Sequence, residues 1–353
     1  MQLTCVVGTY RLSDETGTGI LRLETNETVT VANENGRVKV SKNEQTLGSF
    51  KTLNVKGESA ENRFKLSPSG TLFESRQYDD HLKFTASNKL TIINIVDLEN
   101  YVAGVVQSEV FGCSDDIDFY KVQAIISRTY VMNHLSKHRK DGCNLCDGVH
   151  CQVYKKRNTT EMIHYAAIET AGLVLVDKNN KLISAAFHSN SGGQTTNSED
   201  VWINPLNYLR SVTDTFSLDM KNSTWQKTYT TKEWLDIFQK RYSKYDMPRE
   251  KALNFEQNER KTHFHGKIPL TKMRTDLGLR STFFSVRQEG DTVVLSGKGY
   301  GHGCGLSQEG AVRMVQEGYC MEDVLKFYYN NVNIVNLDSV SFPTKDIVNF
   351  NTF

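Results

Sequence analysis

A change of hydrophobic periodicity near residue 97 is the strongest constraint on how this chain can fold. Before that point apolar and polar residues alternate over short runs, at 28–32, 37–40 and 54–56. Such alternation is typical of half-buried strands, and no helical period of convincing length interrupts it. An Asn-Gly pair at 35–36 indicates a turn between two of the runs. The apolar run at 90–96 closes this part as a buried strand, so residues 1–96 are predicted to be β-rich.

From Asp97 onward the pattern favours helices. Residues 97–106 predict a short helix that leads into a turn at 107–109. Residues 118–135 predict the clearest helix of the chain, because apolar residues recur at steps of three and four behind acidic residues at its start. Further predicted elements are strands at 181–188 and 292–295 and helices at 232–240 and 306–317, the last with Ser307 as cap and Gly318 as stop.

These patterns predict an α+β fold. A chain of 353 residues divided by about 150 residues per domain gives roughly two domains. We expect a β-rich N-terminal region over 1–96, packed with a mixed α/β catalytic core over 97–353. Residues 205–290 are polar and mixed and carry no chemistry-bearing cluster, so they are expected to form an inserted subdomain or a lid.

Composition excludes several classes of protein. The chain has 42 basic and 41 acidic residues, a net charge of +1, so no global field would draw it to nucleic acid or to an anionic membrane. No window approaches the ~20 uninterrupted apolar residues of a transmembrane helix. The first eight residues lack the basic start and apolar core of a signal peptide. Either the protein is cytoplasmic, or its export segment is absent from this chain.

The densest cluster of chemically active side chains lies at 134–151, where three cysteines and three histidines fall within 18 residues. Thiolates and imidazoles at such spacing suit tetrahedral zinc. Cys146, His150 and Cys151 are the candidate ligands, and His138 could supply the fourth. The alternative is a disulfide in an exported protein, from Cys151 to either Cys143 or Cys146.

A glycine-rich run at 297–305 does not fit a nucleotide fingerprint, because Cys304 or Leu306 stands where the third glycine is needed. What remains is a turn that lets the backbone approach a ligand at a helix N-terminus, with His302 at its centre. Glu109 lies between two predicted helices, where a bend would present it, but a lone glutamate is a weak signal of catalysis.

Several motifs together resemble the stage II sporulation protein D/LytB family. They occur in the family's order between about residues 97 and 335, in the stretches 98–110, 121–130, 145–154, 186–193 and 299–311, with 328–332 behind them. The resemblance implies a secreted or membrane-anchored bacterial protein, and so an extracytoplasmic one, that acts on peptidoglycan. It also implies other cell-wall hydrolases, such as an amidase, as partners.

The resemblance assigns roles to individual positions. The family's catalytic glutamate falls on Glu109, its characteristic helix residues fall on Lys121 and Arg128, and its two loop motifs include Ser189 and His302. We expect these last four residues to bind substrate, with structural contacts as the alternative for Lys121 and Arg128. The family's metal ligands fall on His138, Cys146, His150 and Cys151. Four protein ligands leave no coordination position open for water, so these residues predict a structural zinc ion. Cys143 stands where an aromatic residue is more usual and could compete as a ligand. Cys304 replaces a small aliphatic residue.

The resemblance implies lytic transglycosylase activity, and this reaction explains why one carboxylate would be enough. Ordinary glycosidases use two carboxylates, whereas a transglycosylase lets the C6 hydroxyl of N-acetylmuramic acid attack its own C1. Glu109 would act first as acid and then as base, which requires its pKa to rise from ~4.3 toward ~6. One alternative is a non-catalytic peptidoglycan-binding amidase enhancer. Another is a hydrolase in which Asp115 or Asp116 is the second carboxylate, although capping of the next helix also explains both residues.

Overall fold

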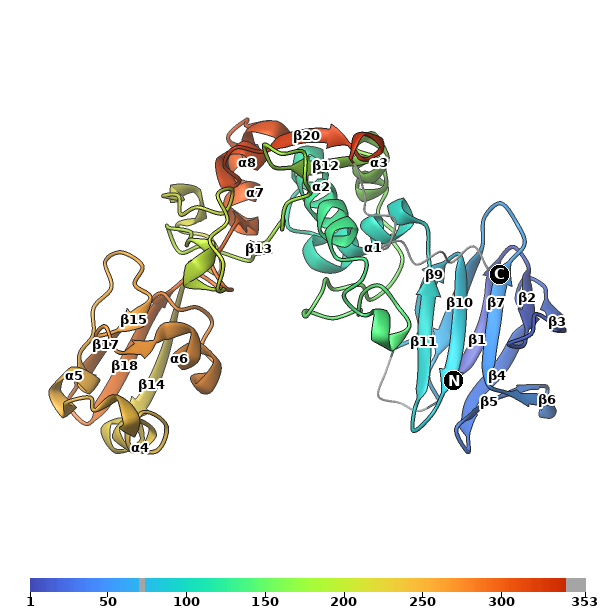
Figure 1. The fold of residues 1–353 in the computed structure, drawn as a ribbon, viewed down its shortest axis with the longest axis horizontal. Coiled ribbons are helices and arrows are strands. Elements are labelled where there is room, and N and C mark those ends of the chain that lie inside the picture. Colours follow the sequence, from blue (N-terminus) through green and yellow to red (C-terminus); the bar gives the residue numbers. More distant parts are fainter. Residues whose placement is uncertain (70–73, 341–353) are drawn as a thin grey trace. The chain divides into compact units, whose positions relative to one another are not determined.

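Alternating apolar residues build the strands of the first part of the chain, in a computed structural model that describes residues 1–69 and 74–340. Within these ranges the chain divides into two units (Figure 1). Unit 1 contains Met1–Phe111 and His134–Ala171, and unit 2 contains Gly112–Asn133 and Gly172–Val340. The end of the predicted core, residues 341–353, lies outside the described residues. The domain boundaries predicted at 97, 205 and 290 stay predictions, but the α+β class is confirmed.

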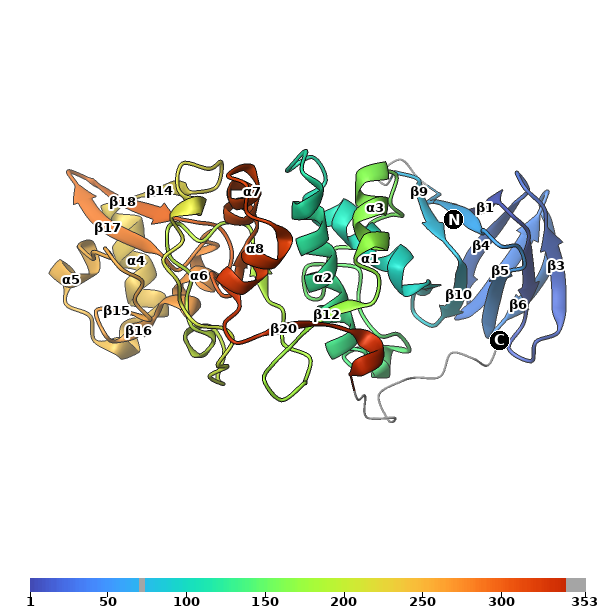
Figure 2. The same cartoon turned by 90° about the horizontal axis from the view of Figure 1, so that it is seen from above.

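Two antiparallel sheets face each other in unit 1 (Figure 2). The first has the order β6-β5-β4-β1-β8-β9 and the second the order β11-β10-β7-β2-β3. The strands are β1 (Gln2–Val7), β2 (Tyr10–Ser13), β3 (Gly19–Leu23), β4 (Thr28–Glu34), β5 (Arg37–Lys42), β6 (Gln45–Phe50), β7 (Thr52–Gly57), β8 (Arg63–Ser67), β9 (Arg76–Asp79), β10 (His81–Ala86) and β11 (Leu90–Ile95). The strands predicted at 28–32, 37–40, 54–56 and 90–96 are therefore confirmed.

The core between these sheets follows from the period of two. Val29 and Val31 on β4 are buried, whereas Thr30 between them is exposed. Leu53 and Val55 on β7 point into the same core from the other sheet. Burying such side chains on both inner faces supplies most of the free energy that holds a sandwich together.

Two helices complete unit 1, α1 (Leu98–Val110) and α3 (Glu161–Glu169), which pack on each other. The Asp97 carboxylate caps α1 by accepting a hydrogen bond from the backbone nitrogen of Glu99 at 2.8 Å. The turn predicted at 107–109 is wrong, because α1 continues through these residues to Val110. Buried apolar residues on the last turn, Val106 and Val110, keep the helix regular there.

Unit 2 is built around α2 (Ile117–Asn133), the helix predicted at 118–135. It packs on α7 (Gln308–Gln316), α8 (Met321–Tyr328) and the β12–β20 pair (Leu173–Val176 and Asn333–Asn336). Ser307 caps α7 as predicted, its hydroxyl accepting from the backbone nitrogen of Gly310. The strand predicted at 181–188 is largely wrong. Only β13 (Phe187–His188) forms, because its ladder partner β19 (Leu306–Ser307) is two residues long.

Residues 224–298 of unit 2 have a core of their own. The strands β14 (Thr224–Thr230), β17 (Phe284–Glu289) and β18 (Thr292–Lys298) form an antiparallel sheet in the order β14-β18-β17. The helices α4 (Thr231–Arg241), α5 (Arg249–Leu253) and α6 (Leu270–Leu277) surround it, with a short β15–β16 hairpin (His263–Phe264 and Ile268–Pro269). Trp234, Phe264 and Met273 are fully buried in this core.

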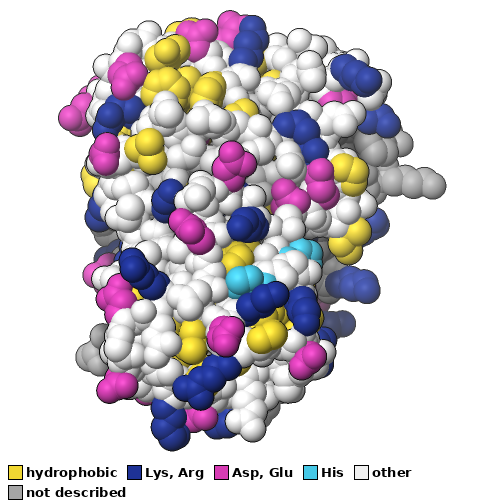
Figure 3. All heavy atoms as spheres, turned by 90° about the vertical axis from the view of Figure 1, so that its left-hand side faces the viewer, with side chains coloured by type: hydrophobic (Ala, Val, Ile, Leu, Met, Phe, Trp, Pro, Cys, Tyr) yellow, Lys and Arg dark blue, Asp and Glu magenta, His cyan; other side chains and the backbone are white. Residues whose placement is uncertain are grey.

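The surface carries no dominant charge on the face that α4 and α5 occupy. Basic, acidic and apolar side chains are interspersed there (Figure 3). Within the described ranges, no helix is both long and apolar enough to cross a membrane.

Candidate active site and metal cluster

Glu109 lies on the last turn of α1 and is half-buried. Its Oε1 accepts a hydrogen bond from the backbone nitrogen of Val153 at 2.7 Å. Oε2 has no hydrogen-bond partner among the residues that the structure describes. The carboxyl group is thus held by one oxygen, while the other is available to carry a proton.

Three consecutive side chains of α1 hold the segment that follows the cysteine cluster. Gln107 accepts from the backbone nitrogen of Thr159 at 3.2 Å, Ser108 from that of Lys155 at 3.0 Å, and Glu109 from that of Val153 at 2.7 Å. Residues 153–159 therefore run alongside α1 and are held by its side chains, without forming a β-ladder. Polar side chains in the last turn of a helix here satisfy backbone groups that no regular element would satisfy.

The same segment is fixed from its other side by the β-sandwich. Tyr78 on β9 donates its hydroxyl hydrogen to the Lys155 carbonyl at 2.8 Å, and Tyr154 donates to the Asn94 side chain at 2.8 Å. The ring of Tyr154 packs against α1 at Gly104, where a Cβ atom would overlap the ring. Glycine at this position thus permits the close approach that brings Val153 to Glu109.

Burial raises the pKa of Glu109 above the ordinary value of a glutamate. The hydrogen bond from Val153 and the positive charge of Lys155 act in the opposite direction but are weaker. Desolvation disfavours the charged form of a carboxyl group, so this environment favours a protonated acid. A raised pKa is what a general acid near neutral pH needs.

The predicted metal ligands come together in the loop after α2. The candidate ligand atoms of His138, Cys146, His150 and Cys151 all lie within 4.8 Å of one another. Nδ1 of His150 is 3.3 Å from Nε2 of His138, 3.8 Å from Sγ of Cys146 and 4.0 Å from Sγ of Cys151. With zinc–ligand bonds of about 2.0–2.3 Å, tetrahedral geometry separates ligand atoms by about 3.3–3.8 Å. The four residues therefore fit a metal ion.

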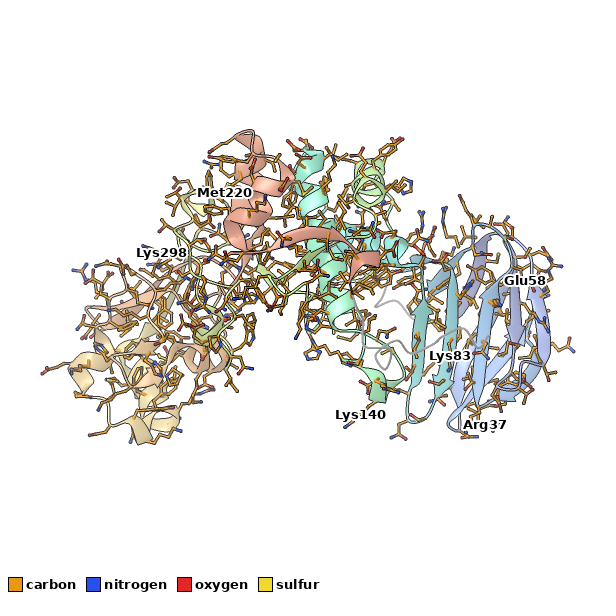
Figure 4. All side chains as sticks on the ribbon, turned by 45° about the horizontal axis from the view of Figure 1, so that its top comes forward. Arg37, Glu58, Lys83, Lys140, Met220 and Lys298 are labelled. Carbon is orange, nitrogen blue, oxygen red and sulfur yellow. The ribbon has the colours of Figure 1, made fainter. Side chains whose placement is uncertain are left out.

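Neighbouring groups orient the same cluster. Asp141 lies 2.8 Å from Nδ1 of His138, which leaves Nε2 of that ring directed at the other ligand atoms. A carboxylate behind a ligating histidine is a common support for metal sites. Lys140, labelled in Figure 4, lies on the short η1 turn (Arg139–Asp141) of this loop.

Cys143 is outside the group of four, and all seven cysteines are free thiols in the structure. Between the two candidates for the fourth ligand, the geometry thus places His138 with the others. Neither disulfide considered from the sequence is formed.

Ser189 and His302 lie on two neighbouring loops of unit 2. These loops are joined by reciprocal backbone hydrogen bonds between Asn190 and Tyr300, at 3.0 and 2.8 Å. The Ser189 hydroxyl accepts from the Asn222 side chain at 3.3 Å, and Nδ1 of His302 accepts from the backbone nitrogen of Cys304 at 3.1 Å. Burial, and then the charge of Arg274, lowers the pKa of His302 to about 4, so the ring is neutral near pH 7.

Lys121 and Arg128 both lie on α2, in unit 2. Arg128 is fully buried and donates to the Leu173 carbonyl at 3.0 Å. Lys121 is half-buried, with its Nζ 3.4 Å from the Asp118 carboxylate. These contacts explain both residues without a substrate, so their assignment to substrate binding stays a prediction.

Asp115 and Asp116, the two candidates for a second catalytic carboxylate, differ in their contacts and exposure. Asp116 accepts from the backbone nitrogen of Asp118 at 2.8 Å at the start of α2, the role of a helix cap. Asp115 is exposed.

Sequence reasoning did not find Val153, Gly104 or Tyr154 as parts of the site. Val153 contributes only its backbone N–H group, which any residue except proline would supply, so its residue type gives no indication of this role. A glycine inside a helix, such as Gly104, is only a weak indication of close packing. Tyr154 lay within the recognised 145–154 stretch, but its contact with α1 joins residues 50 positions apart, which the sequence alone does not reveal.

Comparisons with known proteins give consistent results. A sequence model of the SpoIID family, described as stage II sporulation protein, matches residues 86–176, which include Glu109 and the four residues of the metal cluster. Stage II sporulation protein D of Bacillus subtilis (strain 168) is 30% identical over 267 residues, covering 69% of this chain and 76% of that relative. The protein of the same name from Bacillus amyloliquefaciens has the same identity and coverage. The amidase enhancer of Bacillus subtilis (strain 168) is 26% identical over 291 residues, covering 66% of this chain and 40% of that relative.

Proposed function

This chain belongs to the stage II sporulation protein D family, and from this premise and the site we propose that it is a peptidoglycan lytic transglycosylase acting outside the cytoplasm. It would cleave the bond from N-acetylmuramic acid to N-acetylglucosamine in glycan strands. The observation that carries the proposal is Glu109, a half-buried carboxyl group whose pKa is raised by burial and whose orientation is held by Val153.

The reaction needs one proton-transfer group. Protonated Glu109 donates its proton to the glycosidic oxygen as the bond from that oxygen to C1 of N-acetylmuramic acid breaks. The C6 hydroxyl oxygen of the same sugar then bonds to C1, and the Glu109 carboxylate removes the hydroxyl proton. The products are a 1,6-anhydro end and a free 4-hydroxyl on N-acetylglucosamine, and Glu109 is protonated again.

The metal cluster has a supporting part in this proposal. His138, Cys146, His150 and Cys151 would hold a zinc ion, which stabilises the loop when bound because four protein ligands complete its coordination. Cys151 is two residues before Val153, so the loop that holds the metal also delivers the hydrogen bond to Glu109. No step of the reaction passes through the metal.

The second candidate is a non-catalytic enhancer of an amidase, favoured by the similarity to the Bacillus subtilis protein named amidase enhancer. Product analysis separates the candidates. Purified glycan strands are digested in water labelled with ¹⁸O, and the products are examined by mass spectrometry. Anhydro ends without label support the transglycosylase, labelled reducing ends indicate hydrolysis, and unchanged strands favour the enhancer.

A further inference from the structure

A cluster of rings and cations surrounds the 299–305 loop of unit 2. The centroid of the His302 ring is 5.4 Å from that of His188 and 5.2 Å from that of Trp202. Exposure increases along this row, from His188 at 4% through the half-buried His302 to Trp202 at 43%. The row thus runs from the interior of unit 2 to its surface.

Two arginines stand beside these rings. The guanidinium of Arg260 lies against the loop so closely that a Cβ atom on Gly303 would be 2.8 Å from its Nη2. It donates to the carbonyls of Gln194 and Ser191 at 2.6 and 2.7 Å, which hold it in place without neutralising it. Arg274, on α6, is half-buried, and its side chain has no hydrogen bond or ion pair with any described residue.

No carboxylate compensates these charges. Burial, and then the charge of Arg274, lowers the pKa of Arg260 to about 10, and the opposing influence comes from the thiol of Cys304 and not from a carboxylate of the described residues. The nearby carboxylates of Glu199 and Asp200 act on Cys304 instead. Glu199 forms an ion pair with Arg210, so it is already engaged. Asp200 likewise accepts from Thr196 at 3.2 Å and from Asn197 at 3.3 Å.

Two buried polar atoms at this place lack a partner, Nε2 of His188 and Nε of Arg274. Nδ1 of His188 lies 3.2 Å from the Cys304 carbonyl and must carry the hydrogen, so Nε2 of the neutral ring is an acceptor. Nε of Arg274 is a donor. Buried polar atoms are normally paired, so an unpaired donor on a cation and an unpaired acceptor point to a ligand with an anionic and a hydroxyl or amide group.

The exposed end of the cluster is aromatic. Trp202 is 43% exposed and Tyr300, two residues before His302, is 44% exposed. Lys298, labelled in Figure 4, ends β18 directly before this loop. Amphipathic rings beside a few polar groups are what a sugar-binding surface offers, because the ring face covers the apolar side of a pyranose while the polar groups meet its substituents.

We propose that this part of unit 2 is a binding subsite for a carboxylate-bearing sugar, in which Arg274 pairs with the carboxylate and Trp202 stacks on the pyranose ring. The inference rests on the proposed function, since N-acetylmuramic acid carries a lactyl carboxyl group. The carboxylate can come from that lactyl group or from the end of a stem peptide, and the two sources share one chemistry. The Nε2 acceptor of His188 and the field of Arg260 complete the subsite.

Isothermal titration of the full chain tests this proposal. The ligands are the disaccharide GlcNAc-β1,4-MurNAc and its lactyl methyl ester, and the stem peptide alone and its amidated form. Since the disaccharide lacks the bond proposed to be cleaved, the result does not depend on whether the protein is a transglycosylase. We expect the acid to bind about tenfold more tightly than the ester, the order expected for one charge-assisted contact.

Substitutions identify the groups responsible. Arg274→Gln should abolish the preference for the acid, whereas Arg274→Lys, which keeps the charge, should retain part of it and so exclude loss of folding as the cause. Trp202→Ala should weaken acid and ester alike. Arg287→Gln and Tyr319→Ala, at exposed positions elsewhere on unit 2, are the matched controls and should change neither affinity.

The binding results either overturn or support the proposed subsite. Absence of binding to all the ligands, or a preference for the acid over the ester that survives Arg274→Gln, would overturn the proposal. Equal binding of acid and ester would overturn it as well if the stem peptide and its amidated form also bind equally. Tighter binding of the stem peptide than of its amidated form, lost in Arg274→Gln, would support the anion subsite and assign the carboxylate to the peptide.

Discussion

Oε1 of Glu109 lies 2.7 Å from the backbone nitrogen of Val153, and Val153 follows the cluster residue Cys151 by two positions. The candidate acid and the candidate metal loop are therefore joined through one hydrogen bond and two residues of chain. The β-sandwich supports the same segment through Tyr78 and Tyr154. We therefore expect a change that destabilises the metal loop to disturb the position of the Glu109 carboxyl group as well.

The first prediction concerns the role of Glu109. Glu109→Gln should reduce cleavage of glycan strands by at least ~10²–10⁴, because the amide cannot exchange a proton although it can still accept from Val153. Release of soluble fragments from purified strands measures the effect. Glu289→Gln, on the exposed surface of β17, is the control and should cleave like the wild type. Near-normal cleavage by Glu109→Gln would show that another group transfers the proton.

A second prediction concerns pH and stability. Because burial raises the pKa of Glu109 in the folded state, the folded protein holds this proton more tightly than the unfolded chain. Its contribution to the free energy of unfolding is therefore present at acid pH and declines as pH rises from the ordinary glutamate pKa through the raised one. Glu109→Gln lacks this decline, so its melting temperature relative to wild type should rise with pH across that window. A difference independent of pH would contradict the raised pKa.

The third prediction concerns the metal. Cys146→Ser and Cys151→Ser should lose bound zinc and lower the melting temperature, whereas Cys143→Ser should keep both, because Cys143 lies outside the group of four. Elemental analysis of protein purified without added chelator measures the zinc content. Loss of zinc in Cys143→Ser together with its retention in His138→Ala would instead make Cys143 the fourth ligand.

The fourth prediction concerns the close approach at Gly104. Gly104→Ala should cost about 1–3 kcal/mol, because the added methyl group overlaps the Tyr154 ring and the neighbouring backbone. Gly148→Ala in the same unit meets no atom within 4 Å and is the matched control, expected to change stability little. Urea denaturation compares the two variants. Equal stability of both would mean that the segment moves away from α1 at no cost.

Local order could be predicted well from the sequence. The alternation at 28–32 and 37–40 became β4 and β5, and the spacing of apolar residues at 118–135 became α2, because both patterns report which side of an element faces the core. Errors arose where tertiary contacts overrode local signals. Helix α1 runs through the turn expected at 107–109, and the strand expected at 181–188 shrank to two residues.

The sequence by itself determined the chemistry available to this protein: one glutamate in a recognisable motif and four soft ligands within 14 residues. Ligands so close in the chain need only a local loop to meet, so their cluster could be foreseen. The partner of Glu109 and the grouping of Arg274 with His188, His302 and Trp202 were decided only by the tertiary structure. Glu109 and Val153 are 44 positions apart in the sequence, and His188 and His302 are 114 positions apart. Contacts at such separations depend on how whole elements pack, which no local pattern encodes.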